Sequence, residues 1–134
     1  MAINYLAVVV AAAANFLLGG LWYSPVLFGK KWMALQNITE EDIKRRGGAG
    51  KAYGSAIVGA LVMAYVLAHI VGYADATTAG AGAQSGFWCW LGFVATAGIA
   101  NTMFEHRPLG LYFINAGYYL VSLIIMGVIL AVWR

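Results

Sequence analysis

The side chains in this sequence that could do chemistry are few, and most lie in or beside long apolar stretches. Three asparagines stand inside such stretches, and an amide offers hydrogen-bond donors and acceptors that can coordinate an ion or a small solute. A Glu-His-Arg run adds an acid, a base and a guanidinium, a combination suited to acid–base chemistry on an anionic substrate. Together these side chains form the candidate polar pocket: Asn15, Asn101, Asn115, Glu105, His106 and Arg107.

Each of these groups also has a structural interpretation, which we favour. Amides inside membrane helices commonly hydrogen-bond neighbouring helices, at about 0.6 kcal/mol each on average. The Glu-His-Arg run precedes Pro108, where Arg107 can offset the charge of Glu105 in a turn at the end of a helix. The sequence contains no nucleophile elbow, zinc motif or dinucleotide fingerprint, so we expect no catalytic residues and no enzyme activity.

Two further residues stand alone in the spans: His69, whose imidazole could relay a proton, and Cys89. No Cys, Asp or Glu stands near His69 at metal-ligand spacing, so we expect the imidazole to bond a carbonyl or interfacial water. Cys89 is the only cysteine, which excludes a disulfide scaffold and predicts a buried thiol. We therefore expect neither a metal nor a cofactor.

The composition identifies the elements that position these residues. Of 134 residues, 63% are hydrophobic and 10% charged, and the mean hydropathy is +0.79. Soluble domains carry about 25% charged residues, so this is an integral membrane protein. About 20 apolar residues cross a bilayer as a helix, and the sequence predicts four spans without charged residues. The predicted fold is an all-α, single-domain transmembrane four-helix bundle with approximate spans 3–23, 53–73, 86–104 and 111–133.

The connecting segments differ in character. In the loop 24–52, the stretch 25–35 suits a short helix lying in the membrane interface. A second short helix is expected after Thr39, with acids in its first turn, bases in its last and Gly47 beyond its end. The segment 74–85 is rich in Gly and Thr and is expected to be a flexible connection.

Positive charge is distributed unevenly along the chain. Six Lys and Arg residues lie between the first two spans and Arg107 lies between the last two, whereas Arg134 is alone on the opposite side. The positive-inside rule places both of these loops in the cytoplasm and both termini outside, and we expect the plasma (inner) membrane. All three asparagines then fall in the cytoplasmic halves of their spans, where Thr96 and Thr102 could join them. The basic pI of about 9.1 indicates contact with membrane lipids rather than nucleic acid.

Small residues recur at helical spacing in the spans, and such faces let membrane helices approach closely. The third span has Gly92, Thr96 and Ala100 at this spacing. There are more such faces than two helix contacts require, so either one bundle uses all of them or some join protomers. The second span carries the longest predicted packing face: Ala56, Ala60, Ala64, Ala68 and Gly72.

Several segments have the character of family motifs: Leu18-Gly-Gly-Leu-Trp-Tyr-Ser-Pro25, Phe28-Gly-Lys-Lys-Trp-Met33, Trp90-Leu-Gly-Phe93, Phe104-Glu-His-Arg-Pro108 and Ile114-Asn-Ala-Gly-Tyr118. With these segments the chain resembles domain-of-unknown-function family 1761, small uncharacterised four-span membrane proteins. The resemblance covers nearly the whole chain and implies the four-span architecture, but no established activity. Its most specific motif residues are expected at the cytoplasmic boundary: Trp22, Tyr23, Ser24, Pro25, Phe28, Gly29 and Trp32.

The sequence therefore favours a non-enzymatic membrane protein that works as a homo-oligomer or as an accessory subunit of a larger membrane complex. The alternative is an oligomeric channel or transporter for a small solute or ion, whose path the three asparagines would line. A membrane enzyme acting on lipid headgroups through the Glu-His-Arg run is the least favoured interpretation.

Overall fold

The computed structural model describes residues 2–47 and 50–134, and this part of the chain is helical without any strand. Four of its helices are long and apolar enough to cross a membrane. The predicted all-α fold with four spans is therefore confirmed. The spans are α1 (Tyr5–Trp22), α4 (Gly50–Tyr73), a continuous helix over Ala79–Glu105, and α7 (Leu109–Val132).

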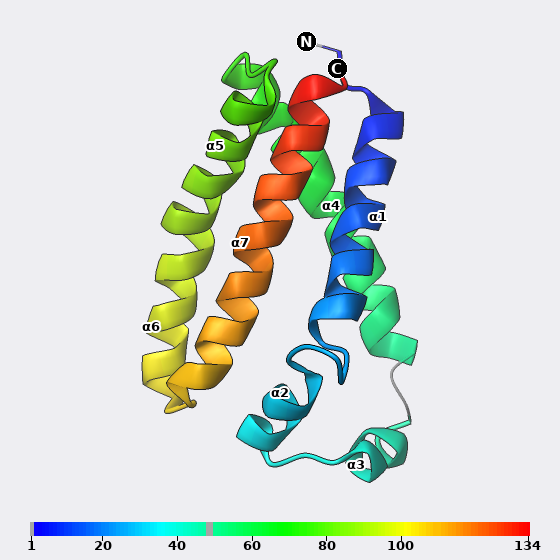
Figure 1. Ribbon diagram of the computed structural model, residues 1–134, viewed down its shortest axis with the longest axis vertical. Helices are drawn as coiled ribbons and strands as arrows, with labels where there is room; N and C mark the ends of the chain where they lie inside the picture. Colours follow the sequence, from blue (N-terminus) through cyan, green and yellow to red (C-terminus); the bar gives the residue numbers. More distant parts are fainter. Residues whose placement is uncertain (1, 48–49) are drawn as a thin grey trace.

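Helix α7 is central. It packs against α1 on one side and against the third span on the other, while α4 crosses behind α1 and α7 (Figure 1). Both chain termini lie at one end of the bundle, which we call the terminal end (Figure 1). Two short helices, α2 (Gly29–Gln36) and α3 (Glu40–Arg45), lie at the opposite end with the turn that precedes α7, and we call this the loop end.

The third span consists of α5 (Ala79–Cys89), a π-helical segment η1 (Trp90–Ala95) and α6 (Thr96–Glu105). The expectation of a flexible connection over 74–85 is wrong in its second half, because the helix already begins at Ala79. The Thr78 hydroxyl caps this helix by accepting a 3.1 Å hydrogen bond from the Ala81 amide. The helix persists through these weakly apolar residues because its glycines pack against α7.

That packing brings two helix backbones into direct contact. Gly82 and Gly86 of α5 and Gly127 of α7 are all buried. A β-carbon at Gly82 would overlap the Gly127 carbonyl, and one at Gly86 would overlap the Leu123 carbonyl. Close backbone approach is the main source of helix association in lipid, so these glycines fix α5 against α7.

The predicted packing face of α4 is used over part of its length. Ala60 and Ala64 are buried in the same core cluster as Ala7 and Ala11 of α1. Ala56 is exposed, as are all residues of α4 from Gly50 to Gly59. Near the loop end, α4 therefore leaves its small residues unpacked within the chain. The two members nearest the terminal end, Ala68 and Gly72, are half-buried.

The short helices at the loop end follow their sequence signals closely. The Thr39 hydroxyl accepts from the Asp42 amide at 3.2 Å, and the Asp42 carboxylate accepts from the Thr39 amide at 2.9 Å. This capping box starts α3 where the sequence predicted a helix, and Gly47 beyond it has a φ of 91°. Helix α2 starts at Gly29, later than the expected interfacial helix over 25–35, because residues 24–28 form turns.

Candidate functional site

A groove of about 290 Å³ lies between α6 and α7 near the loop end. It brings together four of the six residues of the candidate polar pocket: Asn101, Glu105, Arg107 and Asn115. We call this cavity the α6–α7 groove. Its other polar lining residues are Thr102, Tyr112 and Tyr119, and its apolar lining consists of Val94, Gly98, Leu111 and Ala116.

The charged end of the groove is the turn between the two helices. Arg107 Nε lies 2.9 Å from Glu105 Oε2, and both side chains are about half exposed. His106 ends α6 in the left-handed conformation, with a φ of 55°, and does not line the groove. The Arg107 amide donates to the Thr102 carbonyl at 3.1 Å, which closes the turn. The arrangement is an ion pair at a helix end, with the imidazole outside it.

The polar groups deeper in the groove are mostly free of partners. Asn115 Oδ1 accepts a 2.7 Å hydrogen bond from the Tyr23 hydroxyl. Within residues 2–47 and 50–134, no hydrogen bond reaches the Asn115 side-chain nitrogen or the side chains of Asn101, Thr102 and Tyr119. These donors and acceptors are therefore available to a molecule that enters the groove.

The π-helical segment shapes one wall of the groove. Tyr112 of α7 donates a 2.8 Å hydrogen bond to the carbonyl of Ala95, the last residue of the π-helical segment. A β-carbon at Gly98 would lie 3.1 Å from the Tyr112 ring, so a larger residue at position 98 would crowd the ring. The ring thus lies between α6 and α7. Single π-helical turns are frequent at functional sites because they redirect side chains and free carbonyls.

Asn15 lies in a separate network, away from the groove. It is 6% exposed, and its side-chain nitrogen donates to the Ser122 hydroxyl. The Tyr118 hydroxyl lies 2.9 Å from Asn15 Oδ1 and 2.8 Å from the Asn15 carbonyl oxygen. This network joins α1 to α7 with its amide satisfied, as in helix packing. The six candidate pocket residues therefore do not form one site.

The family motif builds the turn from α1 into α2. The Trp22 indole donates a 2.9 Å hydrogen bond to the Ile114 carbonyl of α7, and the Gly29 amide donates to the Ser24 carbonyl at 2.9 Å. A β-carbon at Gly29 would overlap the Tyr23 carbonyl, so the tight turn requires glycine there. Phe28 packs on the Trp22 ring at 4.9 Å. The other motif residues follow the same turn: Pro25 is exposed, and the Trp32 ring meets the Tyr23 ring edge to face at 5.7 Å.

Tyr23 connects this turn to the groove. It directly follows α1, and its hydroxyl reaches Asn115 on α7. Burial, together with the nearby Tyr119 and Tyr118, raises its pKa above the ordinary value of 10.0. The neutral phenol donates its hydrogen bond to the Asn115 side-chain oxygen, and no partner for the amide nitrogen occurs in the described residues.

The other candidate residues, His69, Cys89 and Thr96, do not line the α6–α7 groove. His69 Nδ1 lies 3.0 Å from the Tyr65 carbonyl, and Cys89 is a half-buried free thiol. No group of three or more potential metal ligands occurs in the described ranges. Thr96, expected near the asparagines, is exposed and donates to the Gly92 carbonyl at 2.7 Å instead.

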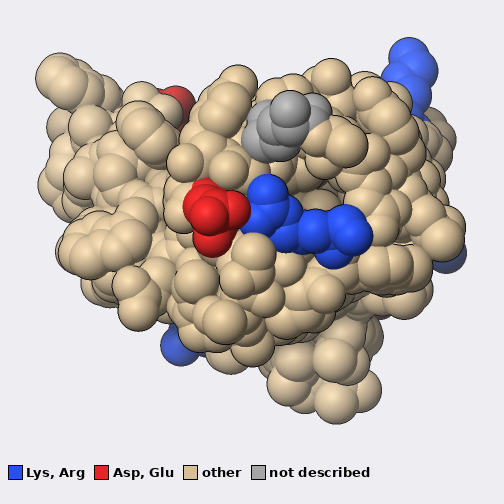
Figure 2. All heavy atoms as spheres, turned by 90° about the horizontal axis from the view of Figure 1, so that it is seen from above, with Lys and Arg blue, Asp and Glu red and all other residues tan. Residues whose placement is uncertain are grey.

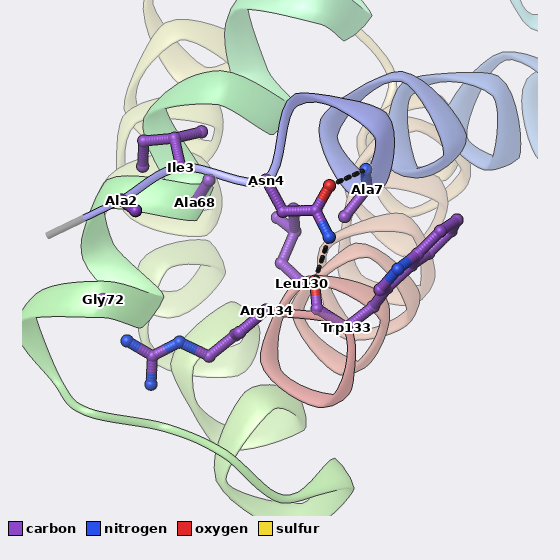
Figure 3. A pocket seen from close by; sticks show the side chains of 9 residues that line it. All are labelled: Ala2, Ile3, Asn4, Ala7, Ala68, Gly72, Leu130, Trp133 and Arg134. Atoms are coloured by element: carbon purple, nitrogen blue, oxygen red, sulfur yellow. Dashed lines mark hydrogen bonds between the residues drawn. The ribbon is translucent and has the colours of Figure 1, made fainter.

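A second cavity lies at the terminal end, where the Asn4 side chain hydrogen-bonds the Ala7 amide and the Trp133 carbonyl (Figure 3). Its volume is about 20 Å³, room for about one water molecule. Arg134 pairs with Asp75 at 3.3 Å on this end, whose surface is otherwise mostly uncharged (Figure 2). The cavity is too small to hold a solute.

Sequence reasoning missed several polar residues that matter here. Tyr112 and Tyr119 line the groove, and Tyr118 and Ser122 complete the Asn15 network. A signal for the groove residues was available: Tyr112, Asn115 and Tyr119 are spaced three and four apart, on one face of a helix.

Comparison with known proteins adds the family. No curated protein and no solved structure matches the chain. The family model described as "Protein of unknown function (DUF1761)" matches residues 6–131, which is nearly the full length. The motif segments that form the turn after α1 and the groove on α7 all lie within this match. This chain therefore belongs to the DUF1761 family.

Proposed function

We propose that this chain is a non-enzymatic integral membrane protein that works as a homo-oligomer. The observation that carries the proposal is an unused small-residue face on the third span. Gly92, Thr96 and Ala100 are all exposed, and a β-carbon at Gly92 would meet nothing within 4 Å. Only 11% of the most apolar stretch of this span is buried within the chain, against 44% for α7.

Small exposed residues suit a protein neighbour better than lipid. Association of membrane helices is driven by close packing, which glycine, alanine and threonine permit. The third span is also the least apolar of the four. A helix with few internal contacts and a small-residue face gains the most from packing against another protein surface.

Helix α4 offers a second face of this kind. Its residues from Gly50 to Gly59 are exposed, and they include Ala52, Ala56 and Gly59. This half of α4 and helix α6 lie at opposite edges of the bundle, both toward the loop end (Figure 1). Two different faces at opposite edges suit a head-to-tail contact that closes into a ring of identical subunits.

The charged turn supports a non-enzymatic role. Glu105 is paired with Arg107, and His106 lies outside the groove, so the acid and the base do not converge on one substrate position. General acid–base catalysis needs both groups within hydrogen-bond reach of the reacting atoms. The side chains instead suit binding.

The test is the subunit count in native membranes. A fluorescent label at the C-terminus, followed by single-molecule photobleaching in native-lipid nanodiscs, should give several bleaching steps for the wild-type protein. Ala100→Leu should reduce the count to one, because a larger side chain blocks close approach. The matched control is Ala13→Leu, on an exposed position of α1, which should keep the wild-type count.

A wild-type protein with one bleaching step would refute the homo-oligomer. Recovery of one copy together with a larger complex would instead make the chain an accessory subunit. A count that Ala100→Leu and Ala13→Leu leave equally unchanged would move the interface away from the third span.

The competing proposal, a channel or transporter for a small solute or ion, draws on the α6–α7 groove. Two of the three asparagines line this cavity with free hydrogen-bonding groups. The third, Asn15, is engaged in its own network and does not extend the path. A liposome flux assay separates the proposals: flux that Asn101→Leu abolishes and Asn15→Leu leaves intact would favour transport through the groove.

A further inference from the structure

The α6–α7 groove holds polar groups without described protein partners, on two helices that are long and apolar enough to span a membrane. Asn101 lies four residues before the end of α6, and Asn115 lies six residues after the start of α7. At about 1.5 Å per residue, these positions are roughly 6 Å and 9 Å inside the helix ends. An amide left unpaired away from water costs about 1–3 kcal/mol, so a polar occupant that pairs with these groups would stabilise the protein.

The donors in the groove are arranged for an anionic oxygen. The guanidinium of Arg107 carries five N–H donors, and its described contact is the one from Nε to Glu105. The Asn115 side-chain nitrogen and the Thr102 and Tyr119 hydroxyls add neutral donors deeper in the groove. Guanidinium and amide donors together are typical of phosphate recognition.

The carboxylate of Glu105, at the helix ends, can accept hydrogen bonds from a cationic group of the same ligand. Glu105 supplies a carboxylate 2.9 Å from the Arg107 guanidinium, and both remain half exposed. The pair is neutral as a whole, so it does not draw a ligand of net negative charge. Two opposite charges side by side match a zwitterion, with its anion on Arg107 and its ammonium on Glu105.

Charge in the groove is confined to one end, as the charges of a phospholipid are confined to its headgroup. The ion pair lies at the helix ends, whereas the deeper lining is neutral and includes Val94, Gly98 and Ala116 beside the polar groups. The volume of about 290 Å³ is at the lower limit of small-molecule sites, which span about 300–1,000 Å³. This space suits a headgroup whose acyl chains remain in the bilayer.

We infer that the α6–α7 groove binds the headgroup of a phospholipid that carries a phosphodiester and a primary ammonium. The phosphodiester lies on Arg107 and the Asn115 amide, and the ammonium donates its hydrogen bonds to Glu105. A quaternary ammonium has no N–H to donate, and a headgroup without an amine leaves Glu105 unmatched. This inference goes beyond the proposed oligomer and stands whether or not the chain self-associates.

The experiment is a lipid titration of the detergent-solubilised protein followed by native mass spectrometry. The probes are phosphatidylethanolamine, phosphatidylcholine and phosphatidylglycerol with identical acyl chains. We expect phosphatidylethanolamine to bind about tenfold more tightly than the other two, the effect of one charge-assisted hydrogen bond. Binding of all three lipids with equal affinity would overturn the inference.

Variants then assign the binding to the groove. Arg107→Gln should weaken phosphatidylethanolamine binding about tenfold, and Glu105→Gln should abolish its preference over phosphatidylglycerol. The matched control is Arg45→Gln, an exposed arginine paired with acidic residues of α3 outside the groove, which should bind as the wild-type protein does. Glu105 is exposed, so Glu105→Gln tests the site with little effect on the stability of the fold. Wild-type affinity and selectivity in both groove variants would overturn the inference.

A last arm separates a lipid from a free solute. Glycerophosphoethanolamine has the same headgroup without acyl chains and is added to the lipid-bound protein. We expect it to leave the lipid bound even at about a hundredfold excess, because the lipid keeps its apolar contacts. Displacement at equal concentration would identify a water-soluble zwitterion as the ligand and overturn the assignment to lipid.

Discussion

The contact between α5 and α7 allows a quantitative prediction for Gly86→Ala. The added methyl group would overlap the backbone carbonyl of Leu123, which cannot move aside as a flexible side chain can. Restoring a carbon–oxygen separation of about 3.3 Å requires the two helices to part by roughly 1 Å. A gap of about 0.5–1 Å already removes a quarter to a half of the dispersion attraction across a packed face. We therefore expect Gly86→Ala to lower the free energy of unfolding by about 1–3 kcal/mol.

The assay is reversible unfolding in mixed micelles, followed by tryptophan fluorescence, with Gly80→Ala as the matched control. Gly80 lies on the same helix, is exposed, and has open space where its β-carbon would lie. Alanine is the better helix former by up to about 1 kcal/mol, so the control should be neutral or slightly stabilising. Equal stability of Gly86→Ala and Gly80→Ala would refute the backbone contact between α5 and α7.

Two further predictions concern hydrogen bonds. Asn15→Ala removes the bonds of the side chain to Ser122 and Tyr118, and at about 0.6 kcal/mol each we expect a loss of about 1 kcal/mol in the same unfolding assay; an unchanged value would contradict the network. Thr39→Ala removes the capping box of α3 and should cost this helix about 1 kcal/mol, seen as about fivefold faster amide hydrogen exchange over Glu40–Arg45 with α1 unaffected. Unchanged exchange in α3 would show that the cap does not hold this helix.

Hydrophobicity predicted the spans, and it failed where a helix lacks large apolar residues. The third span begins with Ala, Gly, Gln and Ser, so the sequence suggested a loop until residue 86. These residues are helical because Gly82 and Gly86 let the backbone of α7 pack closely against them. Hydropathy along a sequence does not report contacts between helices. The usable signals were local: Thr78 as an N-cap and a small-xxx-small pair. Packing against a partner also decides which small residues of α4 are buried: they pack from Ala60 onward, in the core cluster that includes Ala7 and Ala11 of α1.

The candidate site was predicted in part. Asn101, Glu105, Arg107 and Asn115 meet because α6 and α7 are joined by a short turn, which keeps residues at the adjoining helix ends close together. Asn15 is also an amide and lies seven residues before the end of α1, but the rotation of α1 directs it toward Ser122. Sequence position sets the depth of a side chain in the membrane, whereas helix packing sets the direction in which it points.

The amides of Asn15 and Asn115 have different roles in the bundle: the first stabilises helix packing, and the second is available to a ligand. The Asn15 amide is buried and fully engaged, so exchanging it changes stability. The Asn115 amide is engaged on one side only, because Tyr23 takes its carbonyl oxygen and leaves its nitrogen to the groove. Tyr23 is held there by the motif turn, which depends on the glycine at position 29. The turn from α1 into α2, although it lies outside the groove, therefore fixes the orientation of an amide inside it. A Tyr23→Phe variant releases that amide to rotate, and it should weaken ligand binding in the groove while the four spans stay assembled.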